Sequence, residues 1–460
     1  MNCPDCFSTV NPATGEQIET FPFFTAQQTE AALVRAEKSF RSYRKLGVHQ
    51  RAQLLSRLAT TLRKNKAQLA RVITLEMGKI LAEAEAEVEK CAWEAEWYAE
   101  HGPQILADAP APTGTVEAYI SYLPLGPILG IMPWNFPLWQ VTRMGIPTLL
   151  AGNVLLVKHS PNTQRSSLEL ERMMLEAGFP EGVFQNLILK TEDIVNVIND
   201  ERVQGASVTG SVRAGSAVAS EAGAVIKMTV MELGGSDAFI VLEDADIPKA
   251  VAAGITGRFK NAGQICLAAK RFILVGGIAD EFEEQFVEAA RAIRVGDPMD
   301  AASQMGPLAR IDLRDSLHKQ VEGSIAAGAR VLCGGTPKEG KGAFYMPTVL
   351  SGVTQGMPAF DDETFGPVAA ITRVPDVNAA IDAANASQFG LSGNVWTRDV
   401  GLARKMARDL YTGGVFINGV TASDPRVPVG GVKKSGYGRE LSHFGPRTFV
   451  NAQTVWIANS

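Results

Sequence analysis

Short apolar runs alternate with amphipathic segments from Asn153 onward, and this alternation limits the fold more than any other feature of the sequence. Residues 154–157 and 203–208 have the composition of strands. Residues 166–176 have helical periodicity and are followed by Gly178 and Pro180, which end a helix. Strands that alternate with helices in this way form βαβ units around a parallel sheet. The sequence therefore predicts an α/β fold.

A second section of the same kind extends from about residue 234 to 429. Its predicted strands are residues 238–242, 272–275, 330–332 and 368–372. Residues 25–100 differ, because their apolar residues recur at three- and four-residue intervals and predict helices. These residues form an apolar stripe along the helices, which consists of Leu54, Leu55, Leu58, Leu62, Leu69, Val72 and Ile73. For a chain of 460 residues, we expect two doubly wound α/β domains preceded by helices.

Two predicted strands lie outside both sections. Residues 116–125 alternate between apolar and polar side chains, and residues 449–457 supply strand formers such as Val455 and Trp456. Exposed apolar strands of this kind favour pairing between chains.

The composition is that of an ordinary globular protein, with 46% hydrophobic and 20% charged residues. A net charge of -5 gives no reason to expect nucleic acid or an anionic membrane as a partner. No apolar run approaches the roughly 20 residues of a membrane span, and no signal peptide is recognisable. Five scattered cysteines do not form a disulfide framework, so we expect a reducing, cytoplasmic location.

Cys266 stands where a loop meets a predicted strand, after the sequence Phe-Lys-Asn-Ala-Gly-Gln-Ile at residues 259–265. Alone, such a cysteine is more often a small buried hydrophobe than a nucleophile. A thiol at a loop-to-strand corner is nevertheless placed to face a cleft, and the nearby Gly263 permits close backbone approach.

Three other motifs accompany this cysteine. They are Met-Pro-Trp-Asn-Phe-Pro at residues 132–137, Met-Glu-Leu-Gly-Gly-Ser at 231–236 and Asp-Glu-Thr-Phe-Gly-Pro-Val at 362–368. Together with Gly-Gln-Ile-Cys at 263–266, they resemble the NAD(P)-dependent aldehyde dehydrogenase superfamily over nearly the whole chain. Within it the chain is most similar to the bacterial succinate semialdehyde dehydrogenases, through residues 134–143, 234–237 and 441–445.

The resemblance implies three catalytic residues. Cys266 adds to the aldehyde, the Asn135 amide and the Cys266 backbone N–H hold the oxyanion, and Glu232 activates the water that hydrolyses the thioester. The residue types suit this chemistry. Cysteine is the most nucleophilic side chain near neutral pH, and loss of one oxyanion donor typically raises the barrier by about 3–4 kcal/mol. A buried carboxylate becomes a base that works near neutrality.

The same resemblance implies a set of residues that contact NAD or NADP. They are Met132, Pro133, Trp134, Lys158, Ser160, Gly210, Ser211, Gly215, Leu233, Glu363 and Phe365. The turn at residues 209–215 is not the G-x-G-x-x-G fingerprint, but a glycine between strand and helix does place N–H groups against an anion. Pro161 stands where a glutamate often grips the ribose 2′-hydroxyl, so we expect both cofactors to be accepted. His159, Ser160 and Arg165 are candidates to assist with a 2′-phosphate.

A substrate with a terminal carboxylate requires cationic or hydroxyl anchors. Arg143 has the position of a substrate-binding arginine in succinate semialdehyde dehydrogenases, and Lys260, Ser423 and Arg426 are further candidates. A surface ion pair is the competing interpretation for the charged ones. The alternatives for function are oxidation of another ω-carboxy or aliphatic aldehyde such as glutarate semialdehyde, a coenzyme-A-acylating enzyme, and a protein that has lost activity.

By resemblance, residues 1–115 and 132–233 form the cofactor-binding domain and 234–429 the catalytic domain. Residues 116–131 and 440–460 form an oligomerisation arm of a homodimer or homotetramer. We expect no metal, although Cys3 and Cys6 form a C-x-x-C pair of undefined role. Ala268 stands two residues after Cys266, so no disulfide switch is expected there, and Cys91 and Cys333 are expected to be bystanders.

Overall fold

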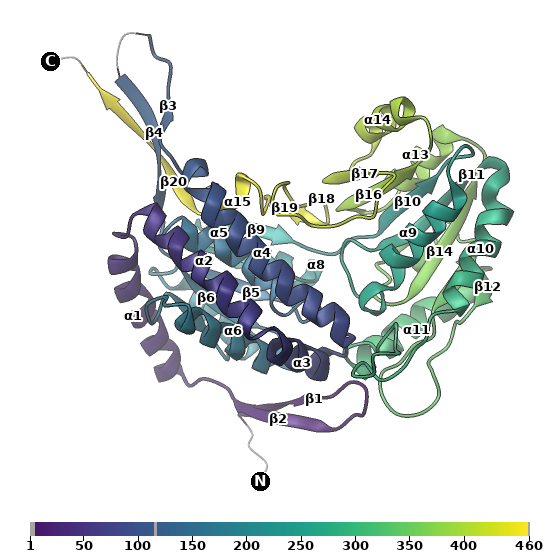
Figure 1. The fold of residues 1–460 in the computed structure, drawn as a ribbon, viewed down its shortest axis with the longest axis horizontal. Coiled ribbons are helices and arrows are strands. Elements are labelled where there is room, and N and C mark those ends of the chain that lie inside the picture. The colour runs from purple at the N-terminus through teal and green to yellow at the C-terminus, as the bar shows by residue number, and fades with distance from the viewer. Residues whose placement is uncertain (1–4, 115–116, 459–460) are drawn as a thin grey trace.

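A six-stranded sheet forms the centre of the first of two lobes in the computed structural model, which describes residues 5–114 and 117–458 (Figure 1). Its strand order is β19-β9-β8-β5-β6-β7. The strands are β5 (Pro127–Met132), β6 (Val154–His159), β7 (Phe184–Asn186), β8 (Gly205–Thr209), β9 (Met228–Glu232) and β19 (Gly436–Tyr437). All pair in parallel except β19, which is antiparallel to β9. The carboxyl ends of β5, β6, β8 and β9 therefore meet at one edge.

Helices surround this sheet. Those between the strands are α5 (Trp139–Leu150), α6 (Gln164–Glu176), α7 (Ile194–Asn199) and α8 (Val212–Ala224). Before them come the hairpin β1 (Cys6–Val10) and β2 (Gln17–Pro22) and the helices α1 (Ala26–Tyr43), α2 (Val48–Lys64), α3 (Lys66–Met77) and α4 (Leu81–Ile105). α4 packs on α2, α3 and α5. Six members of the predicted apolar stripe are buried and Val72 is partly buried, so burial explains the stripe.

The second lobe contains a seven-stranded sheet of order β12-β13-β14-β11-β10-β16-β17. The strands are β10 (Asp237–Val241), β11 (Ala269–Val275), β12 (Arg330–Cys333), β13 (Thr348–Ser351), β14 (Val368–Val374), β16 (Ser392–Trp396) and β17 (Gly414–Ile417). Only the β12–β13 pair is antiparallel. Apolar clusters cover both faces, together with α9 (Ile247–Phe259), α10 (Ala279–Arg291), α11 (Ile311–Ala326), α12 (Pro358–Asp361), α13 (Val377–Asn385) and α14 (Val400–Asp409). The predicted α/β fold with two largely parallel sheets is confirmed.

A three-stranded sheet extends away from both lobes (Figure 1). We call it the arm, and it consists of β3 (Ala109–Pro110), β4 (Glu117–Pro124) and β20 (Val450–Ile457). β4 and β20 pair antiparallel over their full lengths, from Val450 opposite Pro124 to Ile457 opposite Glu117. Both strands were expected from their composition, and the resemblance implied that their two segments form an arm.

The expected boundaries of the arm were too wide. The range 116–131 contains β5, which lies in the middle of the first sheet and pairs with β6 and β8. The range 440–460 contains Glu440 and α15 (Phe444–Thr448), and α15 packs on α5. Apolar strands at a sheet centre and in an arm have similar compositions, so only the pairing separates them.

Candidate active site

Cys266 lies on the loop that connects α9 with β11, and residues of both lobes line the cavity beside it. The backbone turns sharply before it, because Asn261, Ala262 and Gly263 have φ values of 53°, 50° and 74°. Such angles are strained for residues other than glycine. The buried Arg258 holds the turn by donating from Nη2 to the carbonyls of Gly263 (2.6 Å) and Gly366 (2.7 Å).

Lys270 fixes the other side of this loop. Its buried Nζ donates to the carbonyl oxygens of Ile265 (3.0 Å) and Cys266 (2.7 Å) and lies 3.2 Å from Oε1 of Glu363. The Glu363 carboxylate also accepts the N–H of Gly235 at 3.0 Å. The loop that carries the thiol is therefore held before the arrival of any ligand.

Asn135 reaches this loop from the segment after β5. Its side-chain Nδ2 donates to the backbone carbonyl of Gln264 at 3.0 Å, and the backbone carbonyl of Asn135 accepts from Nδ2 of Asn261 at 3.0 Å. An amide NH₂ group has two hydrogens, and this bond uses one of them. The second hydrogen is available to a developing oxyanion beside Cys266, which is the role predicted for Asn135.

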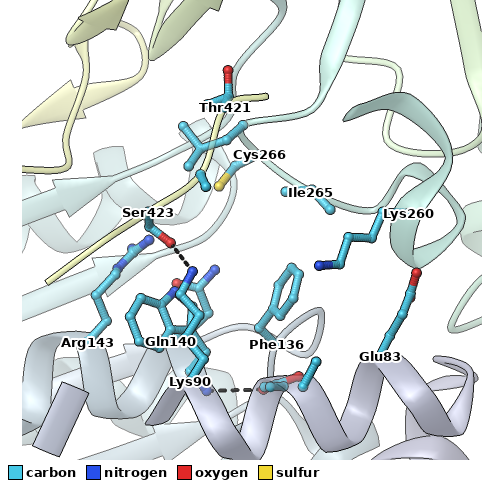
Figure 2. A pocket seen from close by; sticks show the side chains of 15 residues that line it. Glu83, Lys90, Phe136, Gln140, Arg143, Lys260, Ile265, Cys266, Thr421 and Ser423 are labelled. Carbon is cyan, nitrogen blue, oxygen red and sulfur yellow. Dashed lines mark hydrogen bonds between the residues drawn. The ribbon is translucent and has the colours of Figure 1, made fainter. Parts of the chain in front are cut away.

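Two cavities meet at Cys266. The first, which we call the sheet-edge cavity, lies at the carboxyl ends of β8 and β9. It is lined by Pro133, Trp134, Asn135, Gln140, Thr209, Gly210, Ser211, Glu232, Leu233, Gly234, Cys266, Leu313, Glu363 and Phe365. The second, the α4-side cavity, is lined by Glu83, Ala86, Glu87, Lys90, Phe136, Trp139, Gln140, Arg143, Lys260, Ile265, Cys266, Leu267, Thr421, Ala422 and Ser423 (Figure 2). Cys266 and Gln140 are common to both, so one thiol can serve ligands on two sides.

Glu232 is the last residue of β9 and is 3% exposed. Its Oε1 has no hydrogen-bond partner among the described residues, and its Oε2 lies 3.9 Å from Nη2 of Arg143. Burial raises the pKa of Glu232, and the Arg143 charge opposes this shift. A carboxylate with a free oxygen and a raised pKa beside a thiol has the properties of a general base.

Burial also affects the Cys266 thiol, but here a raised pKa disfavours the reactive form. Burial raises the pKa of Cys266 to about 11, against the attraction of the Arg143 and Lys270 charges. The sulfur is therefore a thiol at neutral pH in the unliganded protein and must lose a proton before it attacks.

The sheet edge suits a dinucleotide phosphate. Ser211 caps α8 by accepting the N–H of Ala214 at 3.3 Å. Because Gly210 and Ser211 line the cavity, the N-terminus of α8 lies at its wall, where backbone N–H groups favour an anion. A Cβ on Gly215 would lie 2.5 Å from Cδ2 of Leu233, so a side chain at this position would displace Leu233, which lines the cavity. Of the eleven predicted cofactor contacts, Met132, Lys158, Ser160 and Gly215 are not among the residues that line the cavity beside Cys266. Met132 and Lys158 lie further along the same edge.

Two candidates for a 2′-phosphate, His159 and Arg165, have other contacts in the structure. His159 is buried between the Pro137 carbonyl and the Ser160 N–H, and burial lowers its pKa to about 4. Arg165 is paired with Glu19. Ser160 remains, with its hydroxyl bonded to Asn162 at 2.6 Å.

The predicted substrate anchors separate into three groups. Lys260 and Ser423 line the α4-side cavity, and their role as substrate anchors stays a prediction. Arg143 also lines it, but its Nε is bonded to Glu440 and its Nη2 contacts Thr209 (3.3 Å). Arg426 does not belong to the lining. It is paired with Asp424 at 2.6 Å with 65% of its side chain exposed, so the lining of the cavity does not support it as an anchor and its role stays a prediction.

Several lining or supporting residues were not predicted, namely Glu83, Lys90, Gln140, Arg258, Lys270 and Thr421. Glu83, Ala86, Glu87 and Lys90 follow the i, i+3, i+4, i+7 spacing of one helix face, which turns towards the cavity. That spacing was visible in the sequence. The direction in which this face of α4 points depends on how α4 packs against its neighbours.

None of the other cysteines among the described residues lines either cavity. Cys91 and Cys333 are free, Cys6 is disulfide-bonded, and Cys3 lies outside the described residues. Among residues 5–114 and 117–458, no three His, Cys, Asp or Glu side chains are grouped to hold a metal ion. None of the helices in this part of the chain has the length and apolar character needed to cross a bilayer.

Three proteins that are similar to this chain over nearly its whole length are named as succinate semialdehyde dehydrogenases. The succinate semialdehyde dehydrogenase [NAD(P)+] Sad of Escherichia coli is 51% identical over 97% of both chains. The NADP(+) succinate-semialdehyde dehydrogenase of Mycobacterium avium is 47% identical over 98% of this chain and 97% of its own. A crystal structure of succinic semialdehyde dehydrogenase from Streptococcus pyogenes with NADP+ superposes with a TM-score of 0.96 at 36% identity, covering 98% of this chain and 100% of that one.

A family assignment rests on the whole length of the chain. Residues 2–455 match the aldehyde dehydrogenase family. The four predicted motifs all contribute residues to the two cavities that meet at Cys266. The chain belongs to the aldehyde dehydrogenase family.

Proposed function

We propose that the protein oxidises succinate semialdehyde to succinate with NAD+ or NADP+. The observation that carries this proposal is the position of Cys266 between two unlike cavities. One has a helix N-terminus and the aromatic side chains of Trp134 and Phe365, and the other has three cations in its lining. The first suits a dinucleotide and the second a small anionic aldehyde. The names of the relatives from E. coli and M. avium support the same substrate.

Three residues of the site would carry out the steps of this reaction that the protein supplies. Cys266 releases its proton to solvent and its sulfur bonds to the aldehyde carbon, while Asn135 Nδ2 and the Cys266 N–H donate to the resulting oxyanion. The oxyanion becomes the carbonyl of a thioester when the hydride leaves the same carbon. Bound nicotinamide supplies the hydride acceptor. Glu232 then takes a proton from the water that attacks the thioester, which releases the carboxylate product and restores the thiol.

Both forms of the cofactor fit the sheet edge. Pro161, at the start of the short helix after β6, places no carboxylate where a 2′-phosphate would be repelled. Gly210 and Ser211 would face the diphosphate, and Glu363, Phe365 and Trp134 would surround the nicotinamide ribose and ring.

The test is a panel of aldehydes measured with each cofactor. Succinate semialdehyde, glutarate semialdehyde and butyraldehyde are compared by kcat/KM from the absorbance of reduced cofactor. We expect succinate semialdehyde to be the best substrate by about tenfold or more. Equal values for butyraldehyde, which has no carboxylate, would refute the substrate, and a requirement for coenzyme A would refute hydrolysis by Glu232.

We also propose that the arm joins copies of the chain in a homodimer or homotetramer, because β20 carries exposed Trp456 and Ile457. A cytoplasmic location is part of the proposal, since a reducing compartment keeps the Cys266 thiol available.

A further inference from the structure

Lys90 is a cation of the α4-side cavity that belongs to none of the sequence motifs. Its Nζ donates to Oγ of Ser423 at 2.7 Å and lies 4.1 Å from the centre of the Trp139 ring. Figure 2 shows this hydrogen bond within the cavity that also contains the Cys266 sulfur. The lysine is held by a neutral hydroxyl and an aromatic face, and neither neutralises its charge.

The other two cations of the cavity are differently placed. Arg143 is paired with Glu440, and its Nη2 lies 3.9 Å from Glu232. It is therefore suited to positioning those carboxylates. Lys260 is exposed and stands with Glu83 at the opposite side of the cavity from Lys90 (Figure 2).

The acids around Lys90 form no ion pair with it among the described residues. Glu94, one turn further along α4, has no hydrogen-bond partner of its own, but burial raises its pKa to about 8, so it is mostly uncharged at neutral pH. Asp424 is paired with Arg426 (2.6 Å), and Glu87 is paired with Lys79 and accepts the N–H groups of Leu138 and Trp139. Among the residues that the structure describes, no carboxylate oxygen lies within 4.0 Å of Lys90 Nζ. Burial, with the nearby Arg143 charge, lowers the pKa of Lys90 to about 8. An unpaired, partly desolvated ammonium attracts a carboxylate more strongly than a paired one does.

We propose that Lys90, together with the Ser423 hydroxyl, binds the carboxylate of the substrate at the end remote from Cys266. The inference rests on the proposed function and names its specificity residue. Lys90 Nζ has two further hydrogens to donate, and Ser423 accepts from Lys90 while donating its own hydrogen to the ligand. Phe136 and Trp139 line the space between, where they would contact the methylene groups.

The experiment compares two aldehydes in three proteins: the wild type, Lys90→Met and Lys90→Arg. For Lys90→Met we expect KM for succinate semialdehyde to rise about 10- to 100-fold, the range for losing hydrogen bonds to a charged group. The kcat for this substrate and both constants for butyraldehyde should change less than about twofold. Lys90→Arg should recover part of the loss, and Lys319→Met, an exposed lysine on α11, should behave as the wild type.

Three outcomes separate the hypotheses. If the wild type shows no preference for succinate semialdehyde, the proposed substrate fails before any variant is considered. If that preference exists and Lys90→Met retains it, Lys90 is not the anchor. An equal loss for both aldehydes would assign Lys90 a structural role and would also overturn the inference. Succinate provides a readout without turnover: it should slow alkylation of Cys266 by iodoacetamide in the wild type and in Lys90→Arg, but not in Lys90→Met.

Discussion

The Cys266 side chain combines an accessible position with an environment that keeps it protonated. Burial raises its pKa to about 11, so reactivity depends on a base and on nearby positive charge. We predict that Cys266→Ala abolishes turnover, by more than about 10³-fold, while NADP+ binding measured by fluorescence titration is unchanged. Dehydrogenase activity in this variant would contradict the assignment of the nucleophile.

Glu232 should control the pH dependence of the second half of the reaction. Its pKa is raised by burial, and a general base works only when ionised, so activity is lost as the pH falls through that raised value. We predict that kcat of the wild type rises as the pH rises through about 8. Glu232→Gln should give a burst of reduced cofactor, then a steady rate lower by about 10²-fold or more. A variant without a burst, after a visible one in the wild type, would give Glu232 a role before acylation as well.

Glu94 is a buried acid on α4 that the proposed chemistry does not use. It is fully buried, neither carboxyl oxygen has a hydrogen-bond partner among the described residues, and burial raises its pKa to about 8. Between about pH 4.5 and 8 the folded protein therefore holds a proton here that the unfolded chain releases. The contribution to stability is complete below this window and is lost as the pH rises through it.

We predict that Glu94→Gln reduces the fall in unfolding free energy between pH 5 and 8 by more than about 1 kcal/mol, since one pKa unit corresponds to about 1.36 kcal/mol. Urea denaturation at both pH values measures this. The exposed Glu96→Gln, on the same helix, serves as the control. Equal pH slopes for Glu94→Gln and the wild type would mean that Glu94 is ionised in the folded protein.

The loop before Cys266 is the element on which the site depends. Gly263 has φ +74°, and a Cβ there would lie 2.3 Å from the carbonyl oxygen of Gly366. Any side chain must displace one of the two backbones that Arg258 holds together. The shape of this turn is therefore fixed by contacts from α9 and from the segment before β14.

We predict that Gly263→Ala lowers the unfolding free energy by about 2–3 kcal/mol and reduces kcat with it. The matched control is Gly257→Ala in α9, where the nearest atom to a new Cβ is 3.6 Å away. This control should be neutral or more stable by up to about 1 kcal/mol. Similar stability of the two variants in urea would show that the loop adapts freely.

The arm matters at the scale of the whole molecule, because it extends away from the two lobes (Figure 1). Two of its apolar side chains, Trp456 and Ile457, are exposed. Trp456, in β20, is 59% exposed. We predict that Trp456→Asp shifts the protein to a smaller species in sedimentation velocity at low micromolar concentration. Ile18→Asp, at a comparably exposed site on β2, should not. An unchanged mass for Trp456→Asp would place the contact between subunits elsewhere.

Local patterns were sufficient for much of the architecture. The helices of residues 25–100 and the strands of the two sheets follow from periodicity, which reflects which side chains must be buried. That residues 116–125 and 449–457 belong to one arm was implied by the family resemblance, and the structure shows that they pair antiparallel. The pattern could not distinguish β5 from the arm, because both are short apolar runs. What they pair with is a property of the folded chain.

The sequence by itself determined the family, the thiol and the residues that accompany it, because these depend on residue types in a fixed order along the chain. Only the tertiary structure decided which charges remain free. Arg143 and Arg426 are cations in the sequence, but in the fold Glu440 and Asp424 are bonded to them, whereas Lys90 lines the cavity, donates to the Ser423 hydroxyl and has no ion pair among the described residues. Electrostatic interactions depend on distance and burial, and residues as far apart in the chain as Lys90 and Ser423 come together only when α4 packs against the lobe that carries Cys266.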